Sequence, residues 1–126
     1  MMKEQALYKY FASFGIPAFE RNSVPSEQEY PYLTYEIATS ELDSPVPLSV
    51  SLWYRDRDGY SALLESIIKK NELEASLSRG GKLIPYNNGK IWLTRGTPFA
   101  QVMGDDTDSK IKRQIINITA EYLTAE

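Results

Sequence analysis

Alternation of apolar and polar residues in three stretches limits the fold of this 126-residue chain more than any other feature. The stretches are YLTYEIA at 32–38, LSVSLWYRD at 48–56 and the end of IKRQIINITAEYL at 111–123. Successive side chains of a strand point to opposite faces of a sheet, so this pattern predicts half-buried strands. In the last stretch Ile111, Ile115 and Ile118 also suit a helical face, which leaves a helix open as the alternative there.

Two further strands are predicted in KLIPYNNGKIWLTR, residues 82–95. They flank Asn88-Gly89, a pair that accepts the positive φ angles of a type I′ turn. The sequence therefore predicts a tight hairpin at this pair.

Helical spacing places Leu7, Phe11 and Phe14 on one face of a first helix, which Gly15 and Pro17 end. A second helix is expected to begin near Gly59, capped by Asp56 or Asp58. Its predicted apolar stripe comprises Tyr60, Leu63, Leu64, Ile67 and Ile68. Asn71 interrupts this stripe, which favours a bend or two short helices, and the glycines of SRGG at 78–81 are expected to end the segment rather than cradle a phosphate.

The predicted fold is α+β, in the order α-β-β-α-β-β-β, with a mostly antiparallel sheet packed against two helices. A chain of this length forms one core, so we expect a single domain over residues 1–126. Long projecting loops are expected at 20–31, 40–47 and 96–109, where proline, glycine and polar residues break the patterns.

Composition excludes several classes of function. Fourteen Lys and Arg against seventeen Asp and Glu give a net charge of −3, so binding to nucleic acid is not expected. The chain has no Cys and no His, which removes thiolate nucleophiles, imidazole bases and the ligands of most zinc sites. No stretch approaches the roughly 18 apolar residues of a membrane span. We expect a cytoplasmic protein without a cofactor, in which only carboxylates, Lys, Tyr and hydroxyl groups remain for chemistry.

Two charged clusters are candidate sites. Asp105, Asp106 and Asp108 offer carboxylate oxygens for a hard divalent cation, but they lack the spacing of a calcium loop, and a solvated turn is the alternative. Alternating charges in RDRD at 55–58 suit an anion site or a catalytic carboxylate, or else a helix cap with ion pairs across a subunit boundary. Trp53 and Trp92 suit the core and an interface equally.

The segment 96–109 is unusually apolar for a loop, since it carries Phe99, Val102 and Met103. Burying three such side chains returns less free energy than ordering fourteen residues costs. Either further hydrogen bonds hold the segment on its own sheet edge, or a neighbouring subunit completes it.

The chain resembles the tail terminator, or tail completion, proteins of long-tailed bacteriophages and prophages. The stretches that carry the resemblance are FGIPAFERNSVP (14–25), YPYLTYEI (30–37), SLWYR (51–55), GGKLI (80–84), RGTPFAQ (95–101) and IKRQIINITAEYL (111–123). They are patterns of fold and surface, spread over nearly the whole chain, and they include no catalytic signature.

The resemblance implies an α+β subunit that forms a six-membered ring with copies of itself, either in isolation or only on the tail tube. Such a ring caps the tube and joins the tail to the head completion protein, with no reaction to catalyse. This implies a place in the bacterial host cytoplasm during assembly and later in the virion tail. Some relatives respond to divalent cations during assembly. The residues expected at ring contacts are Arg95, Phe99, Gln101 and Met103, with Arg55 and Asp58 as a charge pair between subunits.

Two other functions remain open at this point. The same patterns fit a neighbouring virion role, either head completion or tail tube subunit. A small ligand-binding domain or enzyme that uses Tyr and Asp groups is the third hypothesis, and it requires a deep pocket with convergent polar groups.

Overall fold

The computed structural model describes residues 1–37, 44–105 and 107–124 of the chain. Its elements in chain order are α1 (Lys3–Ala12), β1 (Ala18–Glu20), β2 (Tyr32–Tyr35), β3 (Val46–Arg55), α2 (Ala62–Ser76), β4 (Lys82–Tyr86), β5 (Gly89–Gly104) and β6 (Ile111–Thr124). The predicted α+β class with two helices and a mostly antiparallel sheet is confirmed. The predicted order lacked β1, a strand too short to show a period of two.

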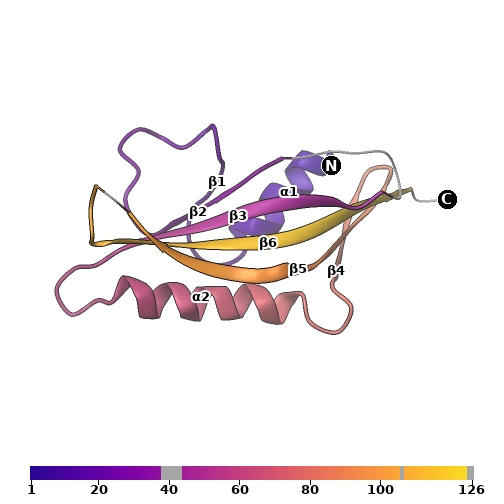
Figure 1. The fold of residues 1–126 in the computed structure, drawn as a ribbon. Coiled ribbons are helices and arrows are strands. Elements are labelled where there is room, and N and C mark those ends of the chain that lie inside the picture. Colours follow the sequence, from indigo (N-terminus) through magenta and orange to yellow (C-terminus); the bar gives the residue numbers. More distant parts are fainter. Residues whose placement is uncertain (38–43, 106, 125–126) are drawn as a thin grey trace.

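The strands form one six-stranded sheet in the order β1-β2-β3-β6-β5-β4. Only β1 and β2 run parallel, and every other neighbouring pair is antiparallel. The sheet curls along its length, with α2 beneath it and α1 behind it (Figure 1). The C-terminal strand β6 therefore lies in the middle, between β3 and β5.

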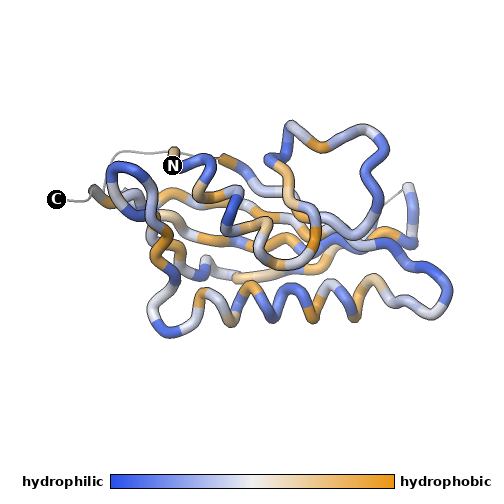
Figure 2. The backbone as a smooth tube through the Cα atoms, turned by 180° about the vertical axis from the view of Figure 1, so that it is seen from behind, coloured by the Kyte–Doolittle hydropathy of each residue, from blue (hydrophilic) through white to orange (hydrophobic). Residues whose placement is uncertain are grey.

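Both helices pack against the same face of the sheet, which we call the helix face. Buried Gln114 of β6 donates from its side-chain amide to Ser66 of α2, and the ring of Phe11 of α1 stacks on Tyr35 of β2 at 4.8 Å. Seen from the opposite side, α1 lies in front of the sheet and α2 below it (Figure 2). The core comprises the alternate residues that point to this face, among them Leu33, Leu48, Val50, Leu52, Ile116, Ile118 and Tyr122. The other face, which neither helix covers, is called the open face below.

The alternating patterns predicted the central strands correctly. β6 is a continuous strand paired with β3 from Ile111 to Ala120, so the helical alternative for this stretch is wrong. β2 ends earlier than predicted, at Tyr35, and Ile37 beyond it is exposed rather than buried. Part of the predicted loop 40–47 belongs to β3, which begins at Val46; residues 38–43 lie outside the described part.

The predicted hairpin forms between β4 and β5, but its turn differs. Tyr86 pairs with Gly89, so Asn87 and Asn88 make the turn rather than Asn88-Gly89. Among the described non-glycine residues only Arg79 has a positive φ. The turn is therefore not of type I′, because that type needs positive φ at both central residues.

The second helix is one element from Ala62 to Ser76, and the predicted break at Asn71 is wrong. Asn71 points to solvent, where a polar residue fits the helix. Ser61 caps the first turn by accepting from the N–H of Leu64, and the Asp56 carboxylate accepts from the N–H of Ala62 at 2.8 Å. RDRD thus acts in part as a helix cap, as one of its two interpretations proposed.

The predicted loop at 96–109 is largely wrong, because β5 continues to Gly104. Ala100 to Gly104 pair with Ile116 to Lys112 of β6, after a bulge in which 96–99 face a single β6 residue. Asn117 donates from its side-chain amide to the carbonyl oxygen of Pro98 at 2.8 Å within this bulge. The backbone hydrogen bonds between β5 and β6 supply stabilisation that burial of Phe99, Val102 and Met103 alone does not.

Candidate functional site

Three of the five residues in the apolar stripe predicted for the second helix are exposed to solvent, while Tyr60 and Ile67 are partly buried. The side facing the sheet carries Ala62, Ser66 and Leu73, whereas Leu63, Leu64 and Ile68 are 40%, 57% and 46% exposed. Lys69 lies on the inner side, where its ammonium donates to the carbonyl oxygen of Phe14 at 2.6 Å. Leu63, Leu64 and Ile68 therefore form an apolar surface without a partner in this subunit.

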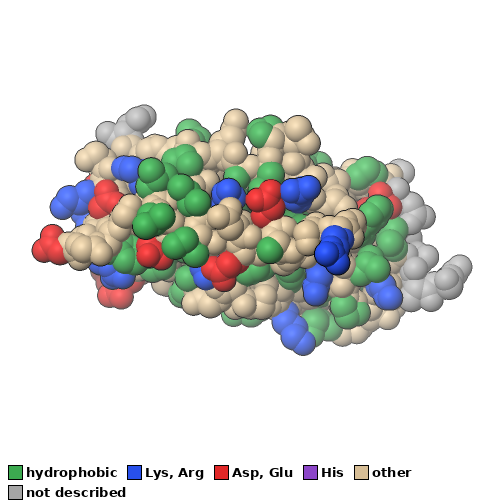
Figure 3. Space-filling view, turned by 90° about the horizontal axis from the view of Figure 1, so that it is seen from below, with side chains coloured by type: hydrophobic (Ala, Val, Ile, Leu, Met, Phe, Trp, Pro, Cys, Tyr) green, Lys and Arg blue, Asp and Glu red, His purple; other side chains and the backbone are tan. Residues whose placement is uncertain are grey.

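The far part of β5 adds to this surface. Val102 pairs with Gln114, so it points to the helix face, and it is 49% exposed. In a view from below, hydrophobic side chains gather over the end of the molecule where α2 begins, with charged groups between them (Figure 3). We use the name apolar surface for Leu63, Leu64, Ile68 and Val102.

The same part of β5 has a free backbone edge. β4 pairs with β5 only from Gly89 to Leu93, so no described strand covers the outer edge from Thr94 to Gly104. The bulge and Pro98 disturb the edge over 95–99, which protects it from pairing. Residues 100–104, AQVMG, have neither charge nor proline, and they leave an edge on which a further strand can add.

The predicted contact residues of β5 lie in several environments. Arg95 donates to Glu74 of α2 at 2.9 Å within the same subunit. Phe99 is partly buried and packs against the subunit's own core. Gln101 and Met103 are exposed, and Met103 points to the open face because it pairs with Arg113.

The structure does not bring Arg55 and Asp58 together as a pair within the subunit. The Nε atom of Arg55 donates to the carboxylate of Asp108 at 3.0 Å, across the start of β6. Asp58 is exposed in the turn that precedes α2. Arg55 thus already has an anionic partner, in a pair whose side chains are 43% and 32% exposed.

Asp105 and Asp108 shape the turn between β5 and β6. One Asp105 oxygen accepts from the hydroxyl and the N–H of Thr107, which lowers the pKa of this carboxyl group. Hydrogen bonds from the N–H of Lys110 and from Arg55 lower the pKa of Asp108 in the same way. Asp106 lies outside the described residues, and within them no group of three or more acidic side chains is placed to hold a metal ion.

A polar cavity of about 330 Å³ opens on the open face, a site that the sequence did not indicate. A row of side chains crosses it from strand to strand: Tyr32 on β2, Trp53 on β3 and Arg113 on β6 lie opposite one another in register. The rings of Tyr32 and Trp53 stack at 6.1 Å, and the Arg113 guanidinium lies 4.6 Å from the Trp53 ring centre.

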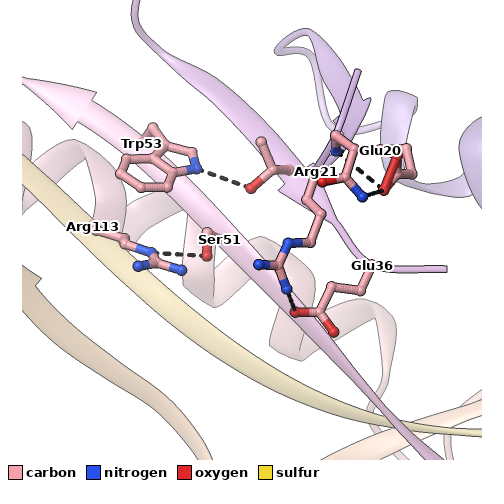
Figure 4. Close-up of polar contacts among 8 residues, drawn as sticks. Glu20, Arg21, Glu36, Ser51, Trp53 and Arg113 are labelled. Atoms are coloured by element: carbon pink, nitrogen blue, oxygen red, sulfur yellow. Dashed lines mark hydrogen bonds and ion pairs between the residues drawn. The ribbon is translucent and has the colours of Figure 1, made fainter. Parts of the chain in front are cut away.

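Two buried hydroxyl groups fix this row (Figure 4). The indole N–H of Trp53 donates to Thr34 at 2.9 Å, and the Nε atom of Arg113 donates to Ser51 at 3.0 Å. Thr34 and Ser51 are 8% and 3% exposed, so neither hydroxyl is free to move away. The wall of the cavity comes from Arg21, whose guanidinium donates to Glu36 at 2.6 Å.

The electrostatics of the cavity favour an anion. Burial lowers the pKa of Arg113, Arg21 lowers it further, and Glu36 acts in the opposite direction. Among residues 1–37, 44–105 and 107–124, no carboxylate lies within 4.0 Å of the Arg113 guanidinium. Sequence reasoning missed this site because its residues are far apart in the chain, and only the register of β2, β3 and β6 aligns them.

The two tryptophans differ in environment. Trp53 is half-buried in the cavity, whereas Trp92 is 38% exposed and its indole N–H donates to the carbonyl oxygen of Gly80 at 2.6 Å. A second, mostly apolar hollow of about 540 Å³ lies between α1 and β4. Its lining is mostly apolar and also includes Lys9, Ser13, Lys82 and Asn87.

Comparison with known proteins gave no match to a protein-family model, to a curated protein or to a solved structure. Neither described helix has the length and apolar character needed to cross a bilayer.

Proposed function

We propose that this chain is a structural subunit that assembles with copies of itself into a ring on the tail tube of a long-tailed bacteriophage, six-membered as the resemblance implies. The ring caps the tube and joins the tail to a head completion protein. In this proposal the protein acts in the bacterial host cytoplasm during assembly and then stays in the virion tail. The resemblance of the sequence supplies the identity of the assembly, and the apolar surface supplies the physical support.

The observation that carries the proposal is the exposure of Leu63, Leu64 and Ile68 on α2. A helix that buries Ser66 while exposing Leu64 and Ile68 loses hydrophobic stabilisation that a partner can restore. Covering side chains that are about half exposed returns on the order of 1 kcal/mol each. The uncharged edge at 100–104 adjoins this surface and adds backbone hydrogen bonds to the same contact.

A closed ring needs two different surfaces on each subunit, which meet head to tail. The apolar surface with the β5 edge is one of them. The apolar hollow between α1 and β4 lies near the start of β5, at the opposite end of that strand from residues 100–104, and offers a second.

The test is electron microscopy of the purified chain mixed with its own tail tubes. The wild type should form rings at tube ends, and the Leu64→Lys and Val102→Lys variants should not, because each places a charge in the contact. Both variants should keep the far-UV circular dichroism and melting temperature of the wild type, since these side chains are exposed. Ring formation by both variants at wild-type levels would contradict the proposed contact.

Glu27→Gln is a control on the tube-binding assay, since it alters charge at an exposed position between β1 and β2, outside both proposed surfaces. It should leave rings intact. Copurification separates this role from the neighbouring ones: a terminator remains with tails assembled without heads, a head completion protein remains with heads, and a tube subunit forms the length of the tube.

A further inference from the structure

The cavity on the open face contains a cation without an anionic partner among the described residues. Ser51 takes the Nε–H of Arg113, and Trp53 covers one side of the guanidinium plane. The two terminal nitrogens of Arg113 remain for a ligand, because neither has a hydrogen-bond acceptor among the described residues. A partly buried guanidinium without a counter-ion is costly, which favours binding of an anion.

The surroundings of Arg113 are organised before any ligand arrives. Thr34 holds the indole of Trp53, Trp53 supports the guanidinium, and Ser51 sets the rotation of the guanidinium plane. These partners come from β2 and β3, two strands of a continuous sheet, so they are held more rigidly than loop residues would be. The folded sheet already orders these side chains, so ligand binding loses little further conformational entropy.

The charge and shape of the site favour a carboxylate over a phosphate. The two terminal nitrogens form one flat edge, which matches the two oxygens of a planar carboxylate in a bidentate contact. Arg21 is engaged by Glu36 at 2.6 Å, so Arg113 is the cation left to balance a ligand. One remaining positive charge suits the single negative charge of a carboxylate better than the double charge of a phosphate.

We propose that the cavity lined by Arg113, Trp53, Ser51 and Thr34 binds a carboxylate group, carried either by a small organic acid or by an acidic side chain of a peptide. The carboxylate accepts two hydrogen bonds from the terminal nitrogens of Arg113, beside the ring of Trp53. This site lies on the open face, and it does not depend on the ring proposed above.

Fluorescence titration of the full chain tests the proposal. The sequence has two tryptophans, so the Trp92→Phe variant leaves Trp53 as the reporter. Titration with succinate and with a tetraglutamate peptide, at constant ionic strength, should change Trp53 emission in a saturable manner. Tighter binding of succinate identifies a small acid as the source, and tighter binding of the peptide identifies an acidic segment.

Arg113→Gln in the same background should weaken binding about ten-fold or more, the loss expected for charged hydrogen bonds. Ser51→Ala should weaken it less, because the cation stays but its orientation is released. Arg57→Gln is the matched control: Arg57 also lies over an aromatic ring, that of Tyr60 at 4.2 Å, but outside this cavity. It should bind as the parent does.

Three results would overturn the proposal. They are a linear response without saturation, equal binding by Arg113→Gln and its parent, and tighter binding of inorganic phosphate than of succinate. If Arg113→Gln does not fold, amide and indole chemical shifts of the wild type decide the matter. Succinate should then move the Trp53 indole signal and leave that of Trp92 in place.

Discussion

Asn117 of β6 donates from its side-chain amide to the carbonyl oxygen of Pro98, 2.8 Å away in the bulge of β5. At this bulge, the set of β5 residues that face the helices changes. Before the bulge Leu93 faces Ala120, and after it Val102 faces Gln114, so the sets change from odd to even numbers. The bulge thereby points Val102 toward the helix face and Met103 toward the open face.

Gly96→Ala should destabilise the protein by about 1 to 3 kcal/mol, because the new methyl group enters a tightly packed space. A Cβ at this position would lie 2.8 Å from the backbone oxygen of Asn117. Urea unfolding measures the loss. Gly104→Ala on the same strand is the control, since a Cβ there meets nothing within 4 Å. Equal stability of the two variants would show that the bulge relaxes freely.

Phe99→Ala should lower the free energy of unfolding by about 1.5 to 3 kcal/mol, roughly half the cost of a fully buried phenylalanine. Its ring is partly buried against the subunit's own core. Met103→Ala should change stability by less than about 0.5 kcal/mol, because Met103 is 48% exposed. Thermal and urea unfolding of the isolated chain compare the two, and a Phe99→Ala variant as stable as wild type would assign this ring to an interface instead.

The turn at 105–110 should loosen in acid. The folded state lowers the pKa values of Asp105 and Asp108 through hydrogen bonds from Thr107, Lys110 and Arg55. Their contribution is therefore present above the aspartate pKa of the unfolded chain and is lost as the pH falls through the lower folded values. NMR titration of the carboxyl carbons measures both pKa values. Asp108→Asn should reduce the dependence of melting temperature on pH in this range, and an unchanged profile would argue against the contacts.

At alkaline pH the buried tyrosines should govern stability. Burial raises the pKa of Tyr122 to about 12 and also raises that of Tyr54. A raised pKa gives stability that is complete below the tyrosine pKa of the unfolded chain, and this stability is lost as the pH rises toward the folded value. Absorbance at the tyrosinate band should show late ionisation, coupled to unfolding. Tyr122→Phe should weaken this alkaline dependence, whereas ionisation of all tyrosines at the ordinary pKa would contradict the burial.

The sequence predicted what depends on local alternation. β3 and β6 were found because each buries every second residue on the helix face, while the other residues, apart from buried Ser51, stay at least partly accessible. The second helix was found, but its buried side was not. The apolar pattern assumed that Leu64 and Ile68 face the core, and it contained no information about which side the sheet would cover.

The errors in β5 and the absence of the cavity from the sequence analysis have a common cause. Gly96 and Pro98 looked like the breakers of a loop, yet a bulge accommodates both inside a continuous strand. The cavity arises because Ser51 and Trp53 lie beside Arg113, residues that are separated by about half the chain. Strand pairing determines which distant residues become neighbours, and a local sequence pattern does not predict strand pairing.

Because both helices lie on one side of the sheet, successive residues of β6 alternate between the core and the open face. Ile116 and Ile118 lie in the core, whereas Ile115 and Thr119 lie on the open face. Substitutions at the outward positions can alter what the protein recognises and leave its interior untouched. Single substitutions on the open face can thus change the binding partner during evolution without a change in the core.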